Sequence, residues 1–95
     1  MNSFSGVGII SDVKTSGKAL KFKLSLQQEK SCDIPCLLFD QNDEVKDRLE
    51  NLASSEQIVW LQGRVYCSVS EYQGKKRTQF NILTYANGIR EILLF

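Results

Sequence analysis

Histidine is absent from the 95 residues of this chain, and several other features are scarce. Without histidine the commonest general base and metal ligand is missing, so a Ser-His-Asp or Cys-His catalytic site is excluded. The longest apolar runs are only a few residues, too short to span a bilayer. The first five residues have neither a basic start nor an apolar stretch of signal-peptide length. We therefore expect a non-enzymatic, cytosolic (cytoplasmic) protein that makes no membrane contact.

Cysteine is scarce as well, with only Cys32, Cys36 and Cys67 in the chain. An odd and small number of cysteines argues against a disulfide framework. Cys32 and Cys36 are four residues apart, but zinc would need a fourth ligand that the chain scarcely supplies. We expect buried free thiols, with no metal and no cofactor.

Net charge is nearly absent, because twelve Lys and Arg stand against eleven Asp and Glu. The charges are segregated, however: residues 1–31 carry +3, residues 32–57 carry −5 and residues 58–95 carry +3. Local potential rather than net charge steers a charged ligand, so a nucleic-acid partner is compatible with this total. The length fits one small domain over residues 1–95, and 42% hydrophobic residues are ordinary for a folded protein.

Period-2 alternation is clearest in Ala19–Leu26, where every second residue is apolar. The pattern predicts a half-buried strand with Lys21 and Lys23 facing outward and four residues facing the core, namely Leu20, Phe22, Leu24 and Leu26. Comparable but weaker patterns predict four more strands, at Gly6–Val13, Asp33–Phe39, Ile58–Tyr66 and Thr78–Thr84. In the last of these, Phe80 and Ile82 are expected to face inward.

Single residues refine these elements. Pro35 cannot donate to a ladder, so its strand should have an edge or bulge there, and Gly63 in mid-strand suggests a kink. Asn42 or Asp43 can cap a helix from about Asp43 to Leu52, whose apolar stripe is Val45, Leu49 and Leu52. Polar turns are expected at residues 12–18, 27–31 and 72–77. Gly6 and Gly8 are interpreted as barrel-packing glycines, since no helix follows them to make a phosphate cradle.

Five strands with a helix between the third and fourth match the order of the OB-fold, an all-β, five-stranded Greek-key barrel. Three segments also resemble the bacterial single-stranded DNA-binding proteins and their phage and plasmid relatives. They are Asp33–Phe39, Val59–Val65 with its closing Gly-Arg, and Tyr72–Phe80. The resemblance implies a homodimer or homotetramer that binds single-stranded DNA without sequence preference in replication, recombination or repair.

The carboxyl end departs from that family, since replicative members carry a flexible acidic tail and this sequence ends at Glu91–Phe95 without one. Recruitment of replication proteins through such a tail is therefore in doubt. The apolar segment Ile89–Phe95 is expected to dock on the barrel or on a second subunit. Two other functions stay open: an OB-fold protein-interaction subunit of a replication or primosome-type complex, and an RNA-binding OB domain.

Candidate binding residues are cations for phosphates and aromatics for bases. The cations are Lys14, Lys18, Lys21, Lys23, Arg64, Lys75, Lys76 and Arg77. Outward lysines on the second strand could instead protect the sheet from aggregation.

The candidate aromatics are Phe39, Trp60, Tyr66 and Tyr72. Phe39 could instead cover the start of the helix. Trp60 could instead lie in a subunit interface or over the core. Tyr72 lies among cations in an expected loop, where a role in the core is harder to support.

Overall fold

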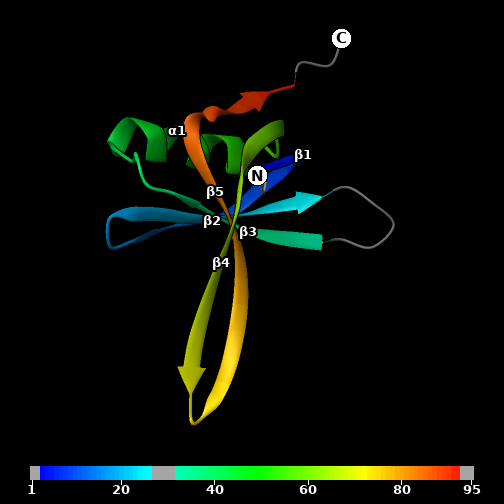
Figure 1. The fold of residues 1–95 in the computed structure, drawn as a ribbon. Coiled ribbons are helices and arrows are strands. Elements are labelled where there is room, and N and C mark those ends of the chain that lie inside the picture. Colours follow the sequence, from blue (N-terminus) through cyan, green and yellow to red (C-terminus); the bar gives the residue numbers. More distant parts are fainter. Residues whose placement is uncertain (1–2, 27–31, 93–95) are drawn as a thin grey trace.

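The computed structural model of the chain describes residues 3–26 and 32–92. Five strands and one helix follow in the order β1 (Ser3–Ser16), β2 (Ala19–Leu26), β3 (Cys32–Leu38), α1 (Asp43–Ser54), β4 (Ile58–Tyr72) and β5 (Lys75–Glu91). The strands close a barrel in the order β1-β2-β3-β5-β4, with β3 and β5 parallel and the other neighbours antiparallel (Figure 1). This order, with the helix between β3 and β4, is that of the OB-fold and confirms the predicted fold class.

The barrel core is built from the inward residues that alternate along the strands. In β2 the predicted pattern is confirmed: Leu20, Phe22 and Leu24 are buried, Leu26 is half-buried, and Lys21 and Lys23 are exposed. Strands β1, β4 and β5 add further inward residues, among them Ile10, Val59, Leu61, Ile82 and Ile89. Gly8 lets β2 come close, because a Cβ there would clash with the Ser25 carbonyl. Its predicted role as a barrel-packing glycine is confirmed.

Helix α1 closes one end of the barrel. Its first turn is capped as predicted, with the Val45 amide donating to Asn42 Oδ1 at 2.8 Å. Leu49 and Leu52 are buried in the core cluster. The Arg48 guanidinium donates to the carbonyl of Ile89 at 2.7 Å, which ties the helix to β5. The helix continues two residues beyond the predicted Leu52. In the described part of the chain, no helix is long and apolar enough to cross a membrane.

Predicted irregularities fall where the strand geometry changes. Pro35 lies on a stretch of β3 paired with β2 alone, because pairing with β5 begins at Cys36. The β4–β5 register shifts between Leu61 and Gly63, which confirms the expected kink. The Ile92 amide donates to the Ile58 carbonyl at 3.0 Å, so the carboxyl-terminal segment follows the barrel at least to this residue. The expected turn at residues 27–31 and the end of the apolar tail lie outside the described residues.

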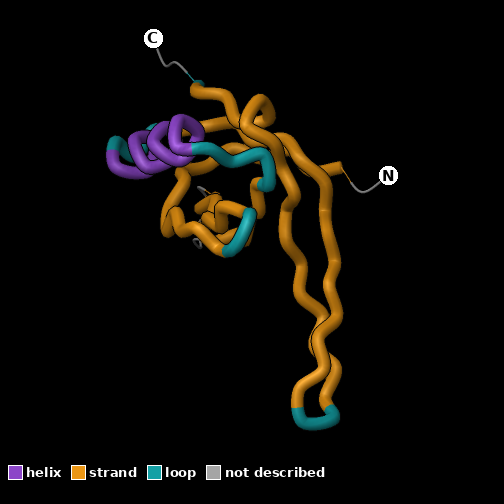
Figure 2. Tube along the Cα trace, turned by 90° about the vertical axis from the view of Figure 1, so that its left-hand side faces the viewer, coloured by secondary structure: helices purple, strands orange, loops and turns teal. Residues whose placement is uncertain are grey.

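Strands β4 and β5 are much longer than predicted. They form a hairpin that projects away from the barrel and turns through only Gln73 and Gly74 (Figures 1 and 2). Both turn residues have positive φ, 51° and 75°, as a type I′ hairpin turn requires. The expected inward position of Phe80 is wrong, since its side chain is 61% exposed. Phe80 lies on the same side of the hairpin as Val65 and Ile82, which face the core nearer the barrel. The barrel ends before Phe80, so its side chain stays exposed.

The cysteines also differ from expectation. Cys36 is buried, whereas Cys32 and Cys67 are exposed, so the prediction of three buried thiols is wrong for two of them. All three are unpaired. Among the described residues, no three His, Cys, Asp or Glu side chains gather as a metal site would require.

Candidate nucleic-acid interface

A groove opens where β3 and β5 separate. The two strands pair only over Cys36–Leu38 and Ile82–Thr84, and beyond that point the β2–β3 and β4–β5 hairpins diverge. Side chains from all five strands line the groove, and those with polar ends are Asp12, Lys14, Lys21, Lys23, Tyr66, Ser68, Gln79 and Asn81. Phe22, Pro35, Cys36 and Leu37 contribute its apolar part. An apolar floor with cations at one wall suits a ligand that has both flat and charged parts.

Three predicted lysines meet at this groove. Lys21 and Lys23 follow each other on the outward face of β2, and Lys14 lies opposite Lys21 in the β1–β2 ladder. Lys18 is exposed in the β1–β2 connection but does not line the groove. Lys14 of β1 and the two lysines of β2, Lys21 and Lys23, thus form one cationic wall of the groove.

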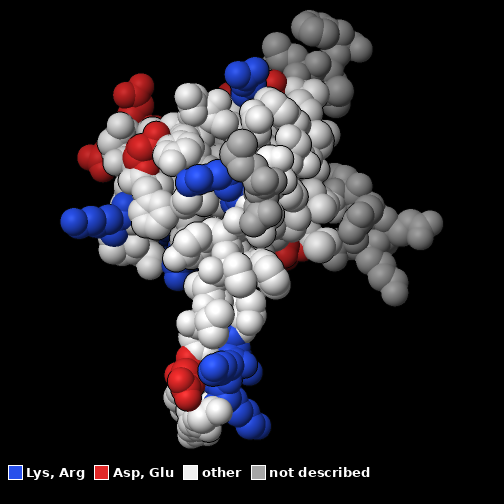
Figure 3. Space-filling model, in the orientation of Figure 1, with Lys and Arg blue, Asp and Glu red and all other residues white. Residues whose placement is uncertain are grey.

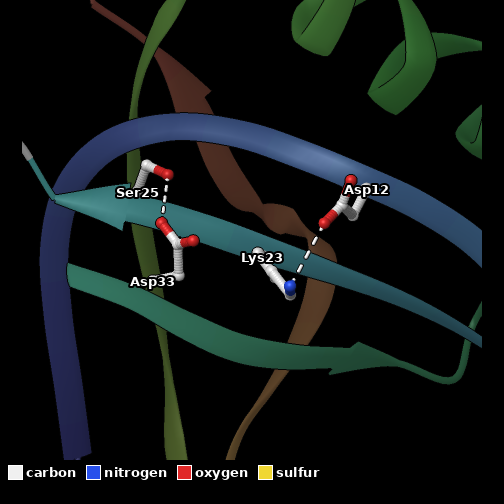
Figure 4. Close-up of polar contacts among 4 residues, drawn as sticks. All are labelled: Asp12, Lys23, Ser25 and Asp33. Atoms are coloured by element: carbon white, nitrogen blue, oxygen red, sulfur yellow. Dashed lines mark hydrogen bonds and ion pairs between the residues drawn. The ribbon is translucent and has the colours of Figure 1, made fainter. Parts of the chain in front are cut away.

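One carboxylate interrupts that wall. The β1–β2 register shifts between Ser11 and Lys14, and Asp12 lies in this bulge with a left-handed φ of 52°. Its Oδ2 is 3.2 Å from Lys23 Nζ, as Figure 4 shows. Further along β2, Ser25 Oγ donates to Asp33 Oδ1 at 2.5 Å (Figure 4). A second carboxylate, that of Asp33, thus lies beyond Lys23 along the β2–β3 hairpin.

One face of the projecting hairpin continues the groove. Residues directly opposite in an antiparallel pair point to the same side. The pairs on the groove side are Tyr66–Asn81, Ser68–Gln79, Ser70–Arg77 and Tyr72–Lys75. A second hollow near the tip is lined by five of these residues and the turn residue Gln73, namely Ser70, Tyr72, Gln73, Lys75, Arg77 and Gln79. We call this surface the groove face of the hairpin; it carries two tyrosines and two cations in a line.

Lys76 lies on the opposite face of the hairpin. It pairs in register with Glu71, whereas Lys75 and Arg77 pair with Tyr72 and Ser70. The three consecutive cations of the sequence are thus divided two to one by strand alternation. Figure 3 shows acidic side chains over α1 at one end of the molecule and the hairpin cations at the other. The acidic side chains of α1 thus lie away from the hairpin cations.

The remaining candidates lie outside the groove. Phe39 is exposed directly after β3, and Arg64 is exposed on the outer face of β4. Trp60 is further along that outer face, next to Val7 of β1, with the Arg90 guanidinium 5.6 Å from its ring centroid. That distance fits a cation–π contact. The structure therefore brings Tyr66 and Tyr72 together with the predicted cations of the groove and the hairpin. Phe39 and Trp60 lie away from these cations.

Some groove residues were missed by sequence reasoning. Gln79 and Asn81 lie within the predicted strand Thr78–Thr84 and alternate with Phe80 and Ile82, so the predicted pattern already placed them on the outward side, but they were not chosen as binding residues. The sequence pattern does not indicate that Asp12 faces the groove, because the orientation of its side chain depends on the bulge in β1.

Cys36 lies at the floor of the groove, where its thiol has low reactivity. Burial raises the pKa of its thiol to about 12, and its Sγ donates to the Ile34 carbonyl at 3.5 Å. Since the thiolate is the reactive form of cysteine, the raised pKa keeps this side chain in its protonated, less reactive form at neutral pH.

Comparison with solved structures shows which proteins share this fold. A Plasmodium falciparum SSB in complex with ssDNA superposes with a TM-score of 0.69 and 14% identity, over 97% of this chain and 95% of that one. A mitochondrial single-stranded DNA-binding protein from S. cerevisiae gives 0.65 and 18%, over 96% and 94%. A small single-stranded DNA-binding protein from Streptomyces coelicolor gives 0.60 and 17%, over 98% and 97%. The chain has the fold of these proteins over nearly its whole length.

Sequence comparisons add nothing to this. No protein-family model matches the chain, and no curated protein matches its sequence.

Proposed function

We propose that this protein binds single-stranded DNA without sequence preference. The observation that carries the proposal is the continuous surface from the lysine wall of the groove, past Tyr66, to Tyr72, Lys75 and Arg77 on the hairpin. Each base has a flat face that can stack on an aromatic ring, and each phosphate can pair with a cation. A surface that alternates these two features recognises a single strand and ignores its sequence.

Two further points support the proposal. The proteins that share the fold include two named for single-stranded DNA binding and one whose structure holds ssDNA. The neutral thiol of Cys36 and the missing histidine leave the groove with binding groups and without the usual nucleophile and base. The proposed activity is therefore binding without catalysis, in replication, recombination or repair. The unpaired thiols favour a cytosolic setting.

The test is a titration of labelled oligothymidine at several salt concentrations, with duplex DNA of equal length as the control. Affinity for the single strand should fall as salt rises, with a slope of about 0.7 for each phosphate contact. The duplex should bind more weakly at every salt concentration. Binding that is absent, or that does not depend on salt, would overturn the proposal and favour the protein-interaction subunit. Stronger binding to oligouridine than to oligothymidine would favour the RNA-binding domain.

The hairpin provides a matched pair of variants. Changing Lys75 and Arg77 together to Ala should lower the salt slope by about 1.4, since two phosphate contacts are lost. Lys76→Ala removes the same kind of charge from the opposite face and should leave the slope nearly unchanged. Equal effects per charge would show that the hairpin acts only through its total charge, and the proposed path along one face would be wrong.

We infer that the protein works as a homo-oligomer, a dimer or a tetramer. Large apolar side chains remain exposed on the single chain, including Val7, Val69 and Phe80. Several grooves on one assembly would raise the avidity for a long strand above that of one groove. Light scattering tests the inference, and a monodisperse monomer at all concentrations would contradict it.

A further inference from the structure

The face of the β4–β5 hairpin opposite the groove face has no use in the proposed DNA path. Its cross-strand pairs are Cys67–Phe80, Val69–Thr78 and Glu71–Lys76. We call these six residues the back face of the hairpin. Phe80 is 61% exposed and Val69 is 64% exposed. The back face therefore presents apolar side chains at its centre and one charge of each sign at its tip.

The back face is an extension of the core side of the barrel. The next pair towards the barrel on this side is Val65–Ile82, which packs against the core. Towards the tip the strands continue, and Cys67, Val69 and Phe80 are exposed there. In Figure 2 the end of the hairpin extends beyond the rest of the described chain. A two-stranded hairpin is marginally stable by itself in water, and one apolar face gains stability when a second sheet packs on it.

The charges at the tip indicate what covers this face. We propose that the back face docks on the same face of a second copy of this chain, around a two-fold axis that runs along the hairpin. In that arrangement β4 of one copy lies opposite β5 of the other. Glu71 then faces the partner's Lys76, and Lys76 faces the partner's Glu71. The apolar centres meet, with Phe80 opposite the partner's Cys67.

Other packings of the two faces fit less well. If the hairpins ran in opposite directions, the tip of one would point at Val65 and Ile82 of the other, where the barrel core already covers this side. The two tips would then lie apart, and neither Glu71 nor Lys76 would face the opposite charge of the other copy. A surface with one charge of each sign beside an apolar centre is self-complementary, as a two-fold contact requires.

The contact is small, and this determines when it forms. Six residues from each copy are far fewer than the roughly 20–30 per side of a stable interface. Free copies therefore associate weakly through it, in addition to any other subunit contact. Copies bound to one DNA strand are held near each other, which raises their effective concentration. Because the groove face points the other way, DNA and the second copy can be bound at once; this step rests on the proposed function.

Charge exchange tests the contact without DNA. Sedimentation equilibrium at increasing protein concentration should show an association step that Glu71→Lys and Lys76→Glu each remove, since like charges then meet at the tip. An equimolar mixture of the two variants should restore the step, because the tips of one are wholly basic and those of the other wholly acidic. Lys75→Glu, the same charge change on the groove face, should leave it intact. Unchanged association in both single variants, or no recovery in the mixture, would overturn the proposal.

The apolar centre is tested on DNA. In a Cys32→Ser background, Cys67 is the exposed cysteine, because Cys36 is buried. A short bis-maleimide should cross-link Cys67 between copies on an oligothymidine long enough for two, and less on one that holds a single copy. Phe80→Thr, which suits a strand, should reduce cross-linking without changing affinity for the short oligonucleotide. If that affinity falls instead, Phe80 contacts DNA and the proposal is wrong.

The two proposals fail in different ways. If the protein does not bind oligothymidine, the proposed function is wrong, and the charge-exchange measurement still decides whether the back faces meet. If oligothymidine binds but the charge variants associate normally, only the docking of the back face is wrong.

Discussion

Asp12 is the carboxylate within the cationic wall, and its removal tests whether the groove binds phosphate through Lys23. Asp12→Asn keeps the shape of the side chain, and asparagine tolerates the left-handed φ of 52° at the bulge. The substitution removes the charge 3.2 Å from Lys23 Nζ. A phosphate that binds Lys23 then no longer has to displace or approach a carboxylate.

The size of the effect follows from the exposure of this ion pair. The side chains of Lys23 and Asp12 are 48% and 56% exposed, so solvent screens their attraction. Exposed pairs contribute about 0.2–1 kcal/mol. We therefore expect Asp12→Asn to tighten oligothymidine binding by roughly 1.4- to 5-fold at low salt. Because Lys23 becomes free to pair with a phosphate, the salt slope should also rise by about 0.7.

Fluorescence anisotropy with labelled oligothymidine at four or more salt concentrations measures both quantities. Asp47→Asn is the matched control, since it removes one negative charge from α1, away from the groove. Asp33→Asn removes one at the far end of the β2–β3 hairpin and should have a smaller effect than Asp12→Asn. If Asp47→Asn raised affinity as much as Asp12→Asn, net charge rather than the Lys23 pair would govern binding, and the reasoning would be refuted.

Three other expectations concern the groove and the core. Tyr66→Ala should weaken oligothymidine binding by about 1–3 kcal/mol without changing the salt slope, because it removes a stacking surface and no charge; a changed slope would contradict this. Leu24→Ala should lower the free energy of unfolding by about 2–5 kcal/mol in urea denaturation, since Leu24 is fully buried, whereas a loss under 1 kcal/mol would mean the core repacks. Burial raises the pKa of the Cys36 thiol from 9.0 to about 12, so the folded protein retains this proton longer than the unfolded chain does. Its contribution to stability is full below pH 9 and is lost as the pH rises towards 12; Cys36→Ala, compared by urea unfolding across that window, should lose less stability with pH.

The parts of the fold that were predictable are those with a burial pattern. Strand β2 alternates because one face is in the core, and α1 was located by its cap and apolar stripe. The hairpin beyond Tyr66 has no such pattern, since residues 69–80 are exposed on both faces. Its length was therefore underestimated, and Phe80 was assigned to a core that ends before it.

The candidate site was predictable as a composition but not as an arrangement. The lysines and tyrosines that meet at the groove were named from the sequence. Which of the three hairpin cations points to the groove depends on strand register, and the place of Asp12 depends on a bulge. Neither is encoded in a local pattern, because both arise from pairing between distant segments.

The two-residue turn at Gln73 and Gly74 determines which residues of β5 lie on the groove face and which lie on the back face. Side chains alternate along both strands, so each residue of the groove face is followed by one of the back face. Adding or removing one residue between Tyr72 and Lys75 would shift β5 by one position against β4, and its side chains would change sides. Arg77 and Gln79 would then lie on the back face, and Thr78 and Phe80 on the groove face. The length of this turn therefore keeps the two proposed surfaces, one for DNA and one for a second copy, on separate sides of one thin hairpin.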